Sequence, residues 1–164
     1  MFKKNTIYLV FLSVLLNTGN VLAGYPKTDA DYMLLPPFCK ARASGSKSLP
    51  YRNWKKKLGP DFIHIHHYCA SLHSFRKAQL MYPKNKDQKQ DKASLLFFIF
   101  DNIKYMENHA KHTFILFPHI YTTKAEAYLE AKKNNLAIDY FNKAITANKK
   151  FTKPYALLSD FYLK

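Results

Sequence analysis

The sequence predicts an all-α protein in which antiparallel helical hairpins follow an irregular N-terminal segment. Three observations lead to this prediction. Apolar residues recur at helical spacing from residue 60 onward. Small and aromatic residues return with a period of 34 residues near the C-terminus. The stretch before residue 60 is interrupted by prolines and by a loop of small residues, which argue against long regular elements there.

The first 23 residues have the features of a cleaved export signal. Lys3 and Lys4 give a positively charged start, residues 7–16 form a short apolar run, and residues 21–23 are small or apolar. A polar stretch ends the run after about ten residues, whereas a membrane span needs roughly 20. We therefore expect cleavage before Gly24 and an exported protein, either periplasmic or secreted.

The mature chain is predicted to have no transmembrane span, because no other apolar run is long enough. About 141 residues remain after cleavage (164 minus 23), enough for one domain with a modest core. The leader holds two lysines and no acid, so its removal lowers the formal charge from +15 to +13. The Lys- and Asn-rich composition suggests a Gram-negative bacterium as the source, in which an exported protein would lie in the cell envelope.

Residues 24–59 are predicted to be poorly regular. Four prolines punctuate them, and residues 43–46 read as a flexible loop. Trp54, the one tryptophan, stands among basic residues. We expect it to pack this segment onto the helices; an exposed role in stacking against a ligand is the alternative.

Residues 60–117 are predicted to form a helical hairpin, a degenerate version of the repeat that follows. Pro60 suits the first turn of a helix, which should stop near Met81 because a Tyr-Pro pair follows. Residues 84–92 contain no apolar side chain and are predicted to be a solvated loop. A second, strongly apolar helix is expected over residues 93–111.

Residues 118–164 carry a pattern of small and aromatic residues that suits two helices crossing closely. Small residues let the backbones approach, and aromatic residues fill the adjoining holes. In the first unit these residues are Tyr121, Ala125, Tyr128, Ala137, Phe141 and Ala144. After 34 residues the first three return as Tyr155, Ser159 and Tyr162, with Leu158 also in the pattern.

These positions resemble the tetratricopeptide repeat (TPR) family over about 47 residues, which is one full repeat and the first helix of another. The sequence departs from the family at Lys124, where a leucine is usual, and at Lys149, where a proline is usual. The chain stops inside the first helix of the second repeat. Either that helix caps the array, or the chain is a truncated member of a longer one.

The resemblance implies an α-solenoid arrangement and a non-catalytic scaffold or adaptor that binds a protein partner. It implies a concave face that takes a peptide or helix, and we expect that face near Tyr121, Lys124, Tyr128 and Tyr155. The sequence itself gives little support for catalysis. It contains no HExxH or GxSxG motif, its few glycines build no phosphate-binding loop, and its carboxylates are scarce. We expect no enzyme activity and no cofactor.

Two cysteines follow the leader, and their environment after export favours a disulfide between Cys39 and Cys69. The alternative is a metal-binding face. His66, Cys69 and His73 are spaced i, i+3, i+7 on one side of a helix, and these residue types suit zinc or copper. A ligand- or metal-binding envelope protein is therefore the second functional hypothesis. Packing and helix capping are the simpler explanation for the seven histidines.

The charge balance predicts an anionic partner. The chain has 26 Lys and Arg against 11 Asp and Glu, and the basic residues are dispersed. Acidic proteins or anionic envelope polymers fit this balance. Export argues against nucleic acid, although basic and aromatic residues alternate in places. Solubility alone explains part of the charge.

Overall fold

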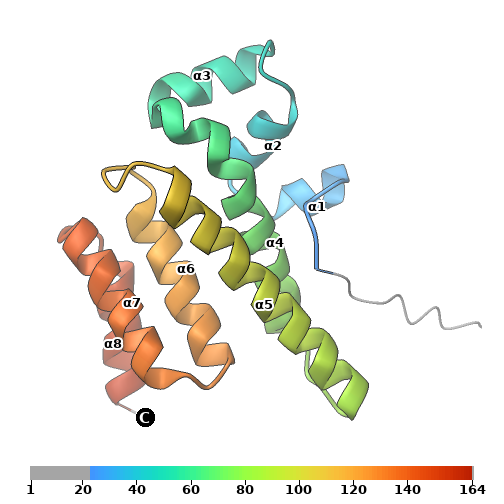
Figure 1. The fold of residues 1–164 in the computed structure, drawn as a ribbon, viewed down its shortest axis with the longest axis vertical. Coiled ribbons are helices and arrows are strands. Elements are labelled where there is room, and N and C mark those ends of the chain that lie inside the picture. Colours follow the sequence, from blue (N-terminus) through green and yellow to red (C-terminus); the bar gives the residue numbers. More distant parts are fainter. Residues whose placement is uncertain (1–22, 164) are drawn as a thin grey trace, which may run out of the picture.

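The computed structural model describes residues 23–163, which fold as eight α-helices and one 3₁₀ helix with no strand among them (Figure 1). The predicted leader lies almost entirely outside the described residues. The elements are α1 (Asp29–Met33), α2 (Pro37–Ala43), α3 (Leu49–Leu58), η1 (Pro60–His64), α4 (Ile65–Leu80), α5 (Lys86–His109), α6 (Phe117–Glu130), α7 (Asn134–Ala147) and α8 (Lys153–Tyr162). The predicted all-α class is therefore confirmed. None of these helices is long and apolar enough to cross a membrane.

The N-terminal segment is more regular than the sequence analysis expected. Three of its four prolines stand at helix starts instead of interrupting helices: Pro36 is the N-cap of α2, and Pro37 and Pro50 lie in the first turns of α2 and α3. Side chains complete the caps. Thr28 and Asp31 form a reciprocal capping box on α1, and the Ser48 hydroxyl accepts from the Tyr51 amide at the start of α3.

Helices α4 and α5 form the predicted antiparallel hairpin (Figure 1). Helix α4 stops at Leu80, as predicted, but α5 begins inside the stretch that was expected to be a loop. The Asn85 side chain accepts a hydrogen bond from the Gln88 amide and so caps a first turn made of polar residues. The absence of apolar residues in this stretch therefore reflects a solvent-exposed start of a helix and not a loop.

Helices α6 and α7 form the second antiparallel hairpin, and α8 packs against α7 (Figure 1). Only three residues join α6 to α7. Among them Lys132 takes a left-handed conformation, with φ of 57°. Ala137, Phe141 and Ala144 are fully buried on α7, as expected for positions at a close helix crossing.

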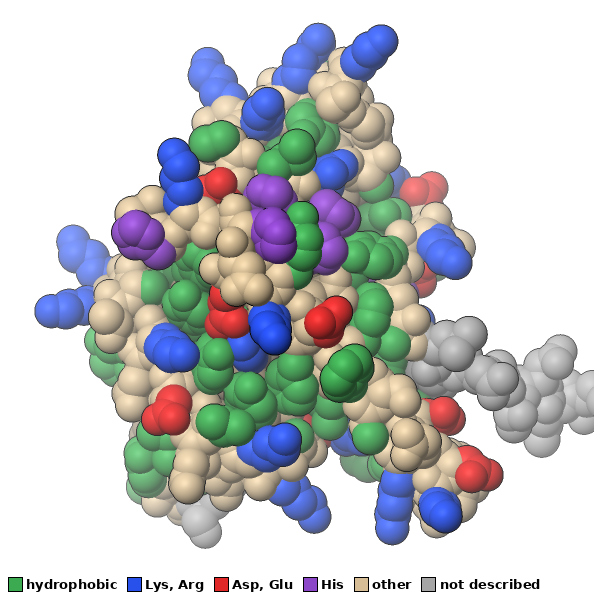
Figure 2. Space-filling view, in the orientation of Figure 1, with side chains coloured by type: hydrophobic (Ala, Val, Ile, Leu, Met, Phe, Trp, Pro, Cys, Tyr) green, Lys and Arg blue, Asp and Glu red, His purple; other side chains and the backbone are tan. Residues whose placement is uncertain are grey.

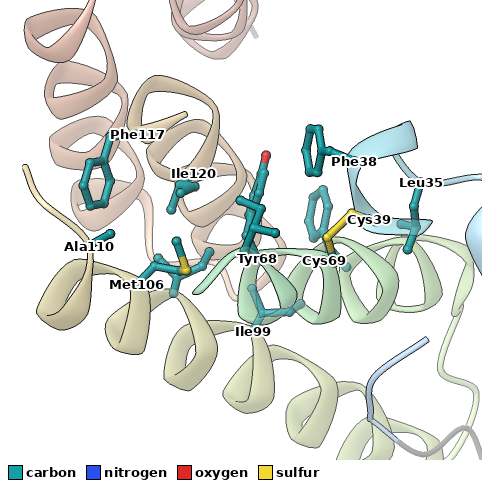
Figure 3. Close-up of a cluster of buried hydrophobic side chains, with 14 of the residues drawn as sticks. Leu35, Phe38, Cys39, Tyr68, Cys69, Ile99, Met106, Ala110, Phe117 and Ile120 are labelled. Atoms are coloured by element: carbon teal, nitrogen blue, oxygen red, sulfur yellow. A yellow bond between two sulfur atoms is a disulfide. The ribbon is translucent and has the colours of Figure 1, made fainter. Parts of the chain in front are cut away.

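The described residues have two hydrophobic cores. The main core joins α2, α3, η1, α4, α5 and one face of α6 (Figure 3). The hairpin core is much smaller and consists of Ala125, Ala137 and Phe141, with partly buried residues of α6, α7 and α8 around them. The predicted disulfide lies in the main core: Cys39 of α2 is bonded to Cys69 of α4, with their Cα atoms 5.6 Å apart.

Candidate functional site

An open groove runs over α6 and α7, with a volume of about 770 Å³. We call it the tyrosine groove because three partly exposed tyrosines line it. Its lining consists of Tyr121 and Tyr128 from α6, Leu136, Asp139, Tyr140, Asn142, Lys143, Thr146 and Ala147 from α7, and His112 from the loop before α6. Figure 2 views the molecule from the side on which α5 and α7 face the reader, where hydrophobic side chains are mixed with charged ones.

Ring contacts hold the three tyrosines in place. Tyr121 and Tyr128 are two helical turns apart on α6, so they share one face. The Tyr128 ring stacks on Phe100 of α5, with centroids 4.4 Å apart. Tyr140 reaches over from α7 and lies 6.0 Å from Tyr121 and 5.5 Å from Tyr128. The groove is thus lined by aromatic rings whose orientation is largely fixed before any ligand arrives.

A buried ion pair lies beneath the tyrosines. Lys124 is only 5% exposed, and its Nζ atom donates to Glu107 Oε2 and to the Tyr140 hydroxyl, each at 2.7 Å. Lys124 therefore does not line the groove, contrary to its place in the predicted binding face. Its role in the structure is to hold Tyr140 against α5 and to neutralise Glu107.

The tyrosine hydroxyls remain protonated well above neutral pH. Burial raises the pKa of Tyr121, Tyr128 and Tyr140, and the negative charge of Glu107 raises each of them further. At neutral pH these side chains offer apolar ring surface and neutral hydrogen-bonding hydroxyls. This combination suits recognition of another molecule more than proton transfer.

The fourth predicted binding residue, Tyr155, lies outside the groove. It belongs to α8, is 44% exposed, and its hydroxyl donates to the Lys149 carbonyl. Sequence reasoning instead missed the contribution of α7. Leu136, Tyr140, Lys143 and Ala147 follow one another at i, i+4, i+7 and i+11, and this spacing could have revealed a second wall.

The structure does not bring His66, Cys69 and His73 together as metal ligands. The Cys69 sulfur is bonded to Cys39, and the two His73 nitrogens lie 3.2 Å from the Gly24 carbonyl and from Asp31 Oδ1. The His66 Nδ1 atom lies 3.1 Å from the Ile63 carbonyl. Within residues 23–163 no three His, Cys, Asp or Glu side chains are arranged to hold a metal ion.

Four histidines gather instead around Tyr105, near the start of α4 and the end of α5, and we call them the histidine cluster: His64, His66, His67 and His109. Figure 2 shows histidines grouped on this face of the molecule. Tyr105 stacks between His67, with centroids 3.6 Å apart, and His109, at 3.9 Å. Burial lowers the pKa of His66 to about 4, helped by the adjacent His67 and Arg42. The His66 ring is therefore neutral at neutral pH.

Tyr25 fastens the N-terminal segment to this histidine cluster. Its hydroxyl donates to Asn102 Oδ1 at 3.2 Å, and its ring contacts His66, His67 and Phe98. The same Asn102 oxygen lies 2.7 Å from His67 Nδ1. The cluster therefore anchors the segment that precedes α1.

Comparisons with protein-family models, with curated proteins and with solved structures found no match to this chain. The resemblance to TPR proteins therefore rests on the residue pattern described above, and the functional argument rests on the groove itself.

Proposed function

We propose that this protein is a non-catalytic, TPR-type protein-binding module that takes a peptide or helix of its partner into the tyrosine groove. The observation that carries this proposal is an open aromatic groove, and the ionisable residues beneath its tyrosines, Lys124 and Glu107, are already paired with each other. Tyrosine is enriched at protein interfaces because it combines large apolar area with a hydroxyl and loses little rotamer entropy on binding.

The TPR-type part of the proposal is supported by how α6 and α7 pack. Ala137, Phe141 and Ala144 have no exposed surface, and Ala137 and Phe141 pack in one cluster with Ala125 of α6. Helix α8 then follows and packs on α7. Stacking of successive helix pairs in this manner is the principle on which repeat scaffolds are built.

The partner we expect is acidic, with an aromatic or aliphatic anchor. Lys143 lies at the groove with its Nζ 4.2 Å above the Tyr140 ring, and the chain as a whole carries a formal charge of +15. A positive surface speeds the association of anionic partners. The apolar rings and Leu136 offer the contact area in which a buried side chain contributes most of the affinity.

We place this function in an oxidising compartment such as the periplasm. The buried Cys39–Cys69 disulfide supports this proposal, because disulfides persist mainly outside the reducing cytosol. The leader-like first residues support it independently.

Selection of a random peptide display library on the immobilised mature protein tests the proposal. The enriched peptides should combine acidic residues with one aromatic or aliphatic anchor. Lys143→Glu should weaken an enriched peptide about tenfold by placing negative charge at the groove, and Leu136→Asp should weaken it at least as much. Both residues are surface positions, so the helical circular dichroism should not change.

Tyr162→Ser is a control outside the groove, because Tyr162 is an exposed residue of α8 that does not line it. Tyr155→Ser asks whether the fourth residue predicted from sequence contributes. We expect neither change to affect binding. Unaltered binding by folded Lys143→Glu and Leu136→Asp variants would refute the groove as the binding site.

A further inference from the structure

Helices α2 and α3 form an unusually basic unit at one end of the molecule, far from α8 (Figure 1). We call residues 32–60 the basic cap. The cap contains no Asp or Glu, although acids flank it on both sides at Asp31 and Asp61. Its seven basic residues are Lys40, Arg42, Lys47, Arg52, Lys55, Lys56 and Lys57. So strong a local imbalance creates a positive potential that an anionic partner would neutralise.

The basic cap also exposes large apolar side chains. Met33 is 82% exposed, and Leu49 is 61% exposed at the first position of α3. Two adjacent hollows, of about 480 and 360 Å³, share Pro50 and Trp54 in their walls. Met33 lines the first hollow and Leu49 the second, so both lie in hollows that adjoin at Pro50 and Trp54.

Basic side chains border these hollows. The Lys57 ammonium lies 5.0 Å from the centre of the Trp54 ring in one hollow. Lys40 lines the other hollow, where its Nζ also pairs with Asp29 of α1 at 2.9 Å. This pair is exposed on both sides and therefore contributes little.

The cap is fixed rigidly to the rest of the protein. The Cys39–Cys69 disulfide ties α2 to α4, and the Arg42 guanidinium donates twice to the Ile63 carbonyl of η1, at 3.1 and 3.0 Å. Trp54 packs edge-on against Phe38 of the main core, with centroids 5.7 Å apart. The apolar and basic groups are thus presented on one preformed surface.

We infer that the basic cap docks the protein on an anionic lipid bilayer. Lysine and arginine beside a bilayer are attracted to anionic headgroups, and the apolar side chains enter the boundary between headgroups and acyl chains. Tryptophan favours that same depth because its ring is amphipathic. A purely polar polyanion would use the charges but would gain nothing from exposed Met33 and Leu49. The inference concerns a surface separate from the tyrosine groove and holds whether or not the groove binds a protein.

Trp54 makes the inference directly testable, because it is the one tryptophan of the chain. The protein should be used from Gly24 onward, since the apolar leader would bind vesicles by itself. Vesicles of phosphatidylglycerol mixed with phosphatidylcholine should shift Trp54 emission to shorter wavelength and sediment the protein at low salt. Vesicles of phosphatidylcholine alone should do neither. Raised salt should weaken the binding.

Two charge variants locate the site. Replacing Lys55, Lys56 and Lys57 together by Gln should weaken binding about a hundredfold, at roughly fivefold for each lysine near the surface. Replacing Lys84, Lys86 and Lys89 by Gln removes the same charge from exposed positions at the opposite end of the α4–α5 hairpin, and we expect less than about a threefold change there. Equal losses in the two triple variants would overturn the inference, because they would show that only net charge matters.

The Leu49→Ser variant distinguishes binding to a lipid bilayer from binding to a polar polyanion. Leu49 is exposed, so the substitution should leave the fold intact, and the loss of its insertion should weaken vesicle binding about tenfold. Unchanged vesicle binding by Leu49→Ser would overturn the inference. So would binding of soluble heparin as tight as that of vesicles, since the apolar surface would then have no part.

Discussion

The two hydrophobic cores of this protein are filled by side chains of different size. The main core is filled by large residues such as Phe62, Ile99 and Met106 and is crosslinked by the disulfide. The hairpin core has one large residue, Phe141, between two alanines, and no covalent link. The main core should therefore tolerate modest changes in volume better, whereas the hairpin core depends on close backbone approach and on a single ring.

Phe141→Ala should have the largest effect and should act on the hairpin core alone. Removing a fully buried phenylalanine typically costs about 3 to 5 kcal/mol. Hydrogen exchange should then show faster exchange in α7 and α8, while α4 and α5 keep their protection. Phe97→Ala is the control, because Phe97 is 73% exposed on α5. Uniform loss of protection in all helices would show that the two cores unfold as one unit.

Removing the disulfide should act on the main core, in contrast to Phe141→Ala. The link closes a loop of 30 residues, so its loss should lower the free energy of unfolding by roughly 3 to 4 kcal/mol. Urea unfolding of the Cys39→Ala/Cys69→Ala variant measures this loss. Hydrogen exchange should rise in α2 and α3 more than in α7. The result would contradict the comparison if α7 lost as much protection as α2.

Ala137→Leu and Ala144→Leu should each destabilise the hairpin by about 1 to 3 kcal/mol, because both side chains are fully buried. Ala147→Leu should change stability by less than about 0.5 kcal/mol, since Ala147 is exposed on the same helix. Melting temperatures of the three variants provide the measurement. Equal losses from all three would show that close helix crossing does not determine the packing of α7.

Lowering the pH should reduce the free energy of unfolding through His66 of the histidine cluster. This effect should be the smallest of the four predicted here. The pKa of His66 is lowered to about 4, chiefly by burial, whereas an unfolded histidine titrates near 6.5. Between these values the unfolded chain binds more protons, so the free energy of unfolding falls as the pH is lowered from 6.5 to 4. His66→Gln should flatten that fall in urea unfolding measured across this range. His112→Gln, an exposed control, should leave it unchanged.

The sequence predicted the long helices well because their apolar periodicity is strong. It failed in the N-terminal segment, where α2 and α3 are short and each has a proline in its first turn. A proline in a first turn looks identical in sequence to a proline that breaks a helix. The start of α5 was missed for a similar reason, since its first turns are fully polar and only the Asn85 cap marks them.

The candidate site was only partly predictable. The helical positions of Tyr121 and Tyr128 placed them on one face, but the sequence could not show that Lys124, between them, meets Glu107 of α5 and becomes buried. That pairing depends on how the two hairpins stack, which local spacing does not determine. Tyr155 was grouped with them by its repeat position, although α8 carries it elsewhere.

Helix α6 belongs to both cores, with Phe117, Ile120 and Ala127 in the main core and Ala125 in the hairpin core. It also supplies two of the three tyrosines of the groove. A partner bound there would favour the ordered state of α6 and would thereby transmit stability to both halves of the protein. Thermal-shift screening of the whole chain could accordingly report partners of the groove, because ordering α6 would stabilise both cores at once.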